Sequence, residues 1–197
     1  IDAALFNHRG QDHYAFEYKL DSLPFGSYYD HEGRSLRNTF LQAPVAYSRI
    51  SSGYSKSRLH PVTGQVKAHL GTDYAAAYGT PIVSTADGVI TEAQFKRYNG
   101  NYVKVKHNSV YTTQYLHMSS IASGINPGAV IEQGQVIGYV GSTGLATGPH
   151  VCYRFWKNGV QVDPYAEDLP RSPPIADSLL PDYIDFLEPI KVKLDAI

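Results

Sequence analysis

Three short stretches of the sequence carry side chains that are able to bind a metal ion. In the first, His69 and Asp73 lie four residues apart, with glycine and threonine between them. In the third, His150 and Cys152 lie two residues apart. Because positions of equal parity on a strand share one face, each pair can point into a single space. Imidazole, carboxylate and thiolate all suit Zn²⁺, so the pattern favours a zinc site.

The second stretch is Tyr115-Leu116-His117-Met118, at the end of an expected strand. Each metal-capable residue also has an ordinary interpretation. A lone cysteine is usually a small buried hydrophobe, and an aspartate after Gly-Thr usually forms a turn. The convergence of several such residues on one small β unit favours the metal site. The other histidines lack a partner at strand or helix spacing, or lie in a loop, and are interpreted as structural: His8, His13, His31, His60 and His107.

The part of the chain that carries these stretches has the signals of an all-β unit. From Val45 to Pro164, turn residues recur about every ten positions, which is typical of a β-sandwich, a barrel or a rolled antiparallel sheet. No long helical pattern interrupts them, which argues against a βαβ fold. Asn99-Gly100 predicts a two-residue hairpin turn. The β-rich runs lie at residues 81–84, 88–95, 102–107, 111–116, 136–140, 151–156 and 160–162.

Both ends of the chain differ from this mainly β core. Alternating residues predict one or two strands before residue 30, with a turn at 23–27, and residues 31–43 favour a short helix that ends before Pro44. Four apolar residues at helical spacing, interrupted by Pro189, predict a C-terminal helical tail. The expected division is an upstream remnant at 1–44, the β domain at 45–168, and a Pro-rich linker with the helical tail at 169–197.

The composition fits a globular protein with one main domain. Of the 197 residues, 43% are hydrophobic and 18% are charged, which argues against a disordered chain. The net charge of −1 provides no basic field, so nucleic acid is not an expected partner. No apolar run approaches the roughly 18 residues of a transmembrane helix, and a single cysteine excludes a disulfide scaffold. The chain begins at Ile1 rather than methionine, so we expect a trimmed, exported form.

Taken together, the motifs from about Ser48 to Pro164 resemble those of the LytM, or lysostaphin-type, zinc peptidases of family M23. Residues 1–44 are similar to the region that precedes this domain in cell-wall endopeptidases of Gram-negative type. The matching stretches include Ser57-Arg58-Leu59-His60-Pro61, His69-Leu70-Gly71-Thr72-Asp73, Tyr115-Leu116-His117-Met118 and Gly141-Ser142-Thr143-Gly144 with Gly148-Pro149-His150.

The resemblance implies a role for each motif residue. His69 and Asp73 match the two zinc ligands of an HxxxD motif, while His117 and His150 match catalytic histidines. Cys152 stands where the family pattern has the histidine that is the third zinc ligand. The implied activity is a zinc-dependent endopeptidase that cuts peptide cross-links between the peptide stems of peptidoglycan, in the cell envelope, the periplasm or outside the cell. The candidates for the substrate groove are Asn101, Tyr74 and Tyr115, together with Tyr54, although packing in the core is the favoured role for these residues.

Cysteine at the third ligand position has physical consequences. A site of His69, Asp73 and Cys152 would place two anionic ligands on Zn²⁺, which makes the metal a weaker Lewis acid. We therefore expect a real zinc site, either catalytic or attenuated, and which of His117 and His150 is the general base stays open. The alternative is an attenuated or inactive LytM-like module that binds the cell wall or regulates an amidase. A lipoyl-type carrier is disfavoured, because no lysine sits on a suitable hairpin.

Overall fold

The structure, a computed structural model, describes residues 2–20, 26–46, 49–59, 66–170 and 172–196. The chain divides into two compact units, one formed by residues 1–39 with 170–197 and the other by residues 40–169. Of the turn expected at 23–27, only the last two residues belong to the described part, and His60 lies outside it.

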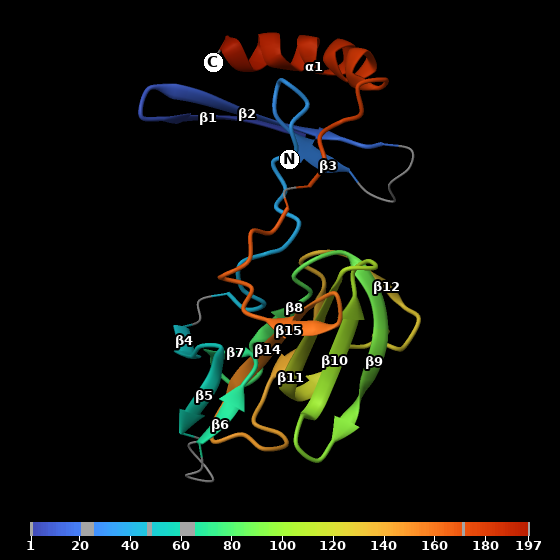
Figure 1. Cartoon of the computed structure of the whole chain (residues 1–197). Coiled ribbons are helices and arrows are strands. Elements are labelled where there is room, and N and C mark those ends of the chain that lie inside the picture. The colour runs from blue at the N-terminus through green and yellow to red at the C-terminus, as the bar shows by residue number, and fades with distance from the viewer. Residues whose placement is uncertain (1, 21–25, 47–48, 60–65, 171, 197) are drawn as a thin grey trace. The chain divides into compact units, whose positions relative to one another are not determined.

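In the first unit, an α-helix packs on a three-stranded antiparallel sheet (Figure 1). Its elements are β1 (Ala3–His8), β2 (Gln11–Tyr18), β3 (Ser27–Tyr29) and α1 (Leu180–Asp195). Phe16 and Tyr29 of the sheet form an apolar core with Tyr183 and Leu187 of the helix. The expected C-terminal helix is therefore confirmed, and its apolar stripe covers a sheet.

The short helix expected over residues 31–43 does not form, and this prediction is wrong. The Asp30 carboxylate accepts hydrogen bonds from the backbone N–H groups of Glu32 and Arg34, both at 2.9 Å. Gly33 between them has a φ of 76°, outside the right-handed helical region. The Asp30 side chain thus stabilises a turn in place of a helix. The spacing of the apolar residues did not indicate this contact.

The second unit is an antiparallel β structure, which confirms the mainly β fold class (Figure 1). Its main sheet has the strand order β12-β9-β10-β11-β14-β7-β4, with β13, β8 and β15 paired beside this path, and β5 pairs with β6 in a separate hairpin. The strands are β4 (Arg49–Ser52), β5 (Ser55–Leu59), β6 (Val66–His69), β7 (Thr72–Ala75), β8 (Pro81–Val83), β9 (Gly88–Lys96), β10 (Gly100–Lys106), β11 (Tyr111–Ile121), β12 (Val130–Ile131), β13 (Val136–Val140), β14 (His150–Lys157) and β15 (Val160–Val162).

The hairpin at Asn99-Gly100 forms, but its loop is longer than expected. Gly100 pairs with Lys96, which leaves three loop residues, and of Asn99 and Gly100 only the glycine has a positive φ, of 68°. A two-residue turn with positive φ at both positions occurs instead at Asn158-Gly159, with φ values of 50° and 78°. The dipeptide type therefore predicted the location of the hairpin but not its length.

Alternation along β7 and β14 separates a core face from a second face that carries the candidate site. Tyr74, Val151 and Tyr153 are buried in the apolar core. Their neighbours Asp73 and Cys152 belong to the opposite face by parity and are paired across the two strands. On each of the two strands, alternate positions thus face the core, and the positions between them face the site.

A β-bulge in β11 changes this alternation at one place. Tyr115 pairs with Val103 and Met118 pairs with Asn101, so three steps along β11 match two steps along β10. Both Tyr115 and Met118 belong to the core, and Leu116 packs with Cys152 on the other face. His117 is the extra residue and has a φ of 65°. The bulge therefore turns His117 away from the core, a recurrent use of bulges beside functional sites.

A buried polar network joins the core faces of β11 and β14 to the chain after β8. The Thr85 hydroxyl lies 2.9 Å from the hydroxyls of both Tyr115 and Tyr153, and the Thr85 N–H donates to Tyr115 Oη at 2.9 Å. Thr113 donates to the same Tyr115 oxygen at 3.0 Å. All four residues are buried, so the loss of one partner leaves a polar group without solvent to replace it.

We expect Thr85→Val to lower the free energy of unfolding by about 1–3 kcal/mol, because the Tyr153 hydroxyl loses its partner inside the core. Urea denaturation followed by tryptophan fluorescence measures this change. The matched control is Thr91→Val, an exposed residue whose effect should stay within about 0.5 kcal/mol. Equal stabilities of the two variants would show that the network contributes nothing.

Candidate metal centre and active site

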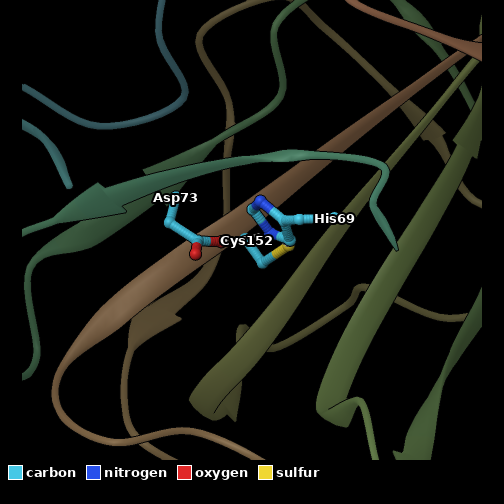
Figure 2. Close-up of side chains that lie close together, drawn as sticks. All are labelled: His69, Asp73 and Cys152. Carbon is cyan, nitrogen blue, oxygen red and sulfur yellow. Dashed lines mark hydrogen bonds and ion pairs between the residues drawn. The ribbon is translucent and has the colours of Figure 1, made fainter. Parts of the chain in front are cut away.

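Three side chains with ligand atoms converge on the site face of the second unit (Figure 2). His69 ends β6, Asp73 lies in β7, and Cys152 lies opposite Asp73 in β14. His69 Nε2 is 3.0 Å from Asp73 Oδ1 and 3.5 Å from Cys152 Sγ, and all three ligand atoms lie within 4.8 Å of one another. The structure thus brings together the three residues that the sequence singled out as metal ligands.

The geometry behind the four-residue spacing differs from the sequence expectation. His69 and Asp73 do not share a strand, because β6 ends at His69 and β7 begins at Thr72. Gly71 lies in the break, where a Cβ atom would be 2.9 Å from Tyr153 O and 3.1 Å from Cys152 Sγ. Glycine therefore lets the chain pass close over β14, and this approach is what brings the His69 ring to the thiol.

Each of three histidine rings binds a backbone carbonyl through Nδ1. The acceptors are Gly53 O for His69 at 3.1 Å, Thr143 O for His117 at 2.8 Å and Gly148 O for His150 at 2.8 Å. A carbonyl oxygen cannot donate, so Nδ1 must carry the proton in each ring. In the neutral imidazoles Nε2 is then the atom with the free lone pair, which can bind a metal ion or accept a proton.

His117 and His150 lie beside the three ligand residues. Their ring centroids are 4.8 Å apart, and His150 Nε2 is 3.9 Å from Asp73 Oδ1. His117 is held from two sides, because its N–H donates to Asn99 O at 2.9 Å and its ring binds Thr143 O. Two imidazole rings therefore lie next to the cluster without belonging to it.

The donor set fits a cation between the three side chains. Asp73 Oδ1 is buried and has no hydrogen-bond partner, although it lies 3.0 Å from His69 Nε2. With the His69 proton on Nδ1, a carboxylate lone pair and an imidazole lone pair face each other. A cation would satisfy both, and tetrahedral Zn²⁺ would separate its ligand atoms by roughly 3.3–3.6 Å. The separations of 3.0 and 3.5 Å around His69 Nε2 are close to that range.

Burial governs the protonation of the site. Burial, followed by the negative charge of Asp73, raises the pKa of the Cys152 thiol to about 12, although Arg154 opposes this. Burial also lowers the pKa of His117 to about 4. For Asp73, burial alone would raise the pKa of the carboxyl, but the hydrogen bond from His69 and the positive charges of His69 and His150, which these rings provide when protonated in acid, hold it below its ordinary value. At neutral pH the site thus holds a carboxylate, a thiol and a neutral His117 imidazole.

Comparison with known proteins shows which family has this fold and these motifs. The model of peptidase family M23 matches residues 67–164. The catalytic domain of lysostaphin from Staphylococcus simulans is 30% identical, with a TM-score of 0.53, and 90% of that domain is covered by 60% of this chain. This chain belongs to peptidase family M23. The matched region holds all five residues of the candidate site, from His69 to Cys152.

Two relatives of this M23 chain come from Vibrio cholerae. The peptidoglycan DD-endopeptidase ShyC is 45% identical over 147 residues, which are 75% of this chain and 34% of ShyC. The crystal structure of a zinc-containing peptidase is 39% identical with a TM-score of 0.63, over 86% of this chain and 51% of that one. The chain spans about a third of the length of the curated relatives that it matches.

Of the four residues expected to line a substrate groove in the M23 domain, Tyr74 and Tyr115 are buried in the core, and neither Asn101 nor Tyr54 lines the cavity around the site. Tyr74 and Tyr115 are 2% and 0% exposed, with their hydroxyls bonded inside the core. Tyr74 faces away from Asp73 by strand parity, and the bulge separates Tyr115 from His117. Asn101 donates to the backbone carbonyls of Met118 and Ser119 and so supports β11. Tyr54 lines a different hollow, beside Trp156.

The cavity of about 250 Å³ around the site is also lined by residues that were not expected to belong to it, among them Arg58, Tyr98, Leu145 and Arg154. The parity of β14 carried a signal for one of them, because Arg154 follows His150 and Cys152 on the same face. Tyr98 lies in the β9–β10 hairpin, and its backbone carbonyl accepts a hydrogen bond from the Leu145 N–H at 3.0 Å. This contact joins two chain segments that no local pattern links.

The low pKa of His117 predicts acid sensitivity of the metal-free M23 domain. The unfolded chain binds a proton at the ordinary histidine pKa of about 6.5, whereas folded His117 binds it only near 4. The stability is therefore complete above pH 6.5 and falls by up to about 3 kcal/mol as the pH drops to 4. Urea denaturation in the presence of a chelator, at pH 7 and pH 4.5, measures this loss.

His117→Gln should remove this part of the pH dependence, because glutamine does not titrate. The exposed His13→Gln serves as the control and should follow the wild-type profile. A wild-type profile in the His117→Gln variant would contradict the assignment of the acid sensitivity to His117.

Proposed function

We propose that this protein is a zinc-dependent endopeptidase that hydrolyses peptide cross-links of peptidoglycan. The observation that carries the proposal is the convergence of His69, Asp73 and Cys152 around an unsatisfied carboxylate oxygen, with two imidazoles beside it. Two relatives named as peptidoglycan DD-endopeptidases, at 45% and 42% identity, support the substrate class.

His69, Asp73 and Cys152 are the residues that would hold zinc. When bound there, zinc would supply Lewis acidity, which polarises a carbonyl group and lowers the pKa of a water molecule. The Cys152 thiol must lose its proton to become a ligand. Because burial keeps this proton on up to about pH 12, zinc binding should release it, and the zinc affinity should rise with pH.

His117 and His150 would move the proton during hydrolysis. In each neutral ring Nδ1–H is bound to a carbonyl, so Nε2 is the atom that can accept a proton from water. Once protonated, the same Nε2–H can donate to the oxyanion that develops on the substrate. The low pKa of His117 keeps its ring neutral, and hence able to accept a proton, through the whole neutral range.

The cysteine ligand would attenuate the enzyme. Thiolate and carboxylate together neutralise the charge of Zn²⁺, whereas a His-Asp-His set would leave one positive charge. The more neutral site polarises a carbonyl and a water molecule less strongly. We therefore propose a slower hydrolase rather than an inactive one, because both proton-carrying histidines keep their contacts.

The cell envelope is the location that we propose, since peptidoglycan is the substrate of the named relatives. Helix α1, the one α-helix among the described residues, lacks the length and apolar character needed to cross a bilayer.

The purified, zinc-loaded protein should release soluble peptides from isolated peptidoglycan, and His150→Ala should reduce the rate by at least about 10²-fold, the typical contribution of general acid–base catalysis. Mass spectrometry of the products identifies the broken bond. The variant should retain its zinc, because His150 is not a ligand in this proposal.

The exposed His13→Ala is the matched control and should be fully active. Binding of peptidoglycan without hydrolysis by the zinc-loaded wild type would favour the alternative, an inactive M23 module. Loss of zinc from a folded His150→Ala protein would instead identify His150 as a ligand.

Cys152→Ser should lower the zinc affinity by at least about tenfold, because a neutral hydroxyl is a poorer zinc ligand than a thiolate. Equilibrium titration against a chromophoric chelator measures the affinity. In the wild type, zinc should also protect Cys152 from alkylation, since a bound thiolate no longer acts as a free nucleophile.

Equal zinc affinity of the wild type and Cys152→Ser, with no protection from alkylation, would show that Cys152 is a core residue only. A third variant, Cys152→His, tests the attenuation separately. It should retain zinc and hydrolyse peptidoglycan faster, and a zinc-loaded variant that is slower would contradict the charge argument while leaving the ligand assignment intact.

A further inference from the structure

We propose that Arg154, together with Arg58 in the same cavity, binds a carboxylate group of the substrate next to the scissile amide and thereby determines which cross-links are cut. This inference rests on the proposed function and deepens it. A carboxylate-binding pair would give the site a preference for free acids over carboxamides.

Arg154 occupies the position on β14 that follows Cys152 on the same face. Its stem packs against the chain at Gly71, where a Cβ atom would be 3.0 Å from Arg154 Cγ. It lines the same cavity as Cys152 and His117. Among the described residues, no carboxylate forms an ion pair with Arg154 within 4.0 Å.

Arg58 reaches the same cavity from β5. Its terminal nitrogen is 3.8 Å from Asp73 Oδ2, near the limit of an ion pair, and its Nε is buried without a hydrogen-bond partner. A buried guanidinium N–H that lacks an acceptor costs free energy unless a ligand supplies one. Arg58 therefore retains a donor that an incoming anion could satisfy.

The balance of charge in the cavity favours an anion. Asp73 is the one carboxylate in its lining, against the two guanidinium groups, as far as the described residues go. If zinc were held by Asp73 and the Cys152 thiolate, those charges would cancel and leave the arginines in excess. The planar fork of an arginine matches a carboxylate with two parallel hydrogen bonds, which gives both affinity and orientation.

The rest of the cavity suits the apolar part of a peptide. Tyr98 is 66% exposed and Leu145 is 40% exposed, and both line the cavity from the β9–β10 hairpin and the loop that binds it. In the sheet, β11 separates β10 from β14. A substrate would thus place its carboxylate toward β14 and an alkyl segment toward Tyr98.

A cross-link made through a side-chain amine leaves the carboxyl groups of that residue as free acids or as amides, and this chemistry supplies the test. Two synthetic cross-linked peptides are compared, identical except for a free carboxylate or a carboxamide next to the scissile bond. For the zinc-loaded wild type we expect kcat/KM to be at least about tenfold higher for the free acid, as one charge-assisted hydrogen bond allows.

Arg154→Gln should bring the ratio of the two kcat/KM values to within about twofold, and Arg154→Lys should keep part of the preference, because the charge remains. The control is Arg49→Gln, which removes an exposed guanidinium on β4 and should keep the full ratio. Zinc content is measured for every variant, since Arg154 also acts on Cys152.

Equilibrium binding of both peptides to the metal-free protein, followed by NMR, provides a readout that does not require hydrolysis. Tighter binding of the free acid to the wild type, lost in Arg154→Gln, would support carboxylate recognition even if neither peptide were cleaved, in which case the proposed function alone would fail. Equal binding and equal cleavage of the two peptides by the wild type, or an unchanged preference in Arg154→Gln, would overturn the inference.

Discussion

The chemistry of the site depends on one repeated contact, the hydrogen bond from a histidine Nδ1–H to a backbone carbonyl. Gly53 provides one acceptor from the β4–β5 connection, and Thr143 and Gly148 provide the other two from the β13–β14 loop. Each contact fixes both the tautomer and the direction of a ring, so that three Nε2 lone pairs are available to one small volume. The sheet supplies the positions of these rings, but the loops decide which nitrogen of each ring meets the site.

Much of the fold followed from short-range patterns, because alternation and turn residues are local properties. The runs at 81–84, 88–95 and 151–156 correspond to β8, β9 and β14 within one or two residues. The helix expected before Pro44 failed because one side chain, that of Asp30, captures the backbone in a turn. Such a contact depends on geometry that apolar spacing does not describe.

The three ligand candidates could be singled out because their types and spacing are visible in the sequence. The sequence did not show in the same way whether the groove candidates face the site. A regular strand would place Tyr115 and His117 on one face, and only the bulge separates them. Arg154 shows the opposite case, since its parity with Cys152 was readable, but its importance depends on Arg58 and Asp73 from other strands. Non-local pairing, rather than residue type, limits what the sequence reveals.

The β13–β14 loop, whose Thr143 carbonyl accepts a hydrogen bond from the His117 ring, meets the β9–β10 hairpin at two glycines, Gly144 and Gly100. A Cβ atom on Gly100 would be 2.5 Å from the carbonyl carbon of Thr143, and one on Gly144 would be 2.3 Å from the backbone nitrogen of Gly100. Both obstacles are main-chain atoms, which every amino acid possesses. No substitution elsewhere can therefore make room for a side chain at either position. In evolutionary terms, this contact admits no compensating second-site substitution, and it can change only through insertion, deletion or movement of a whole loop.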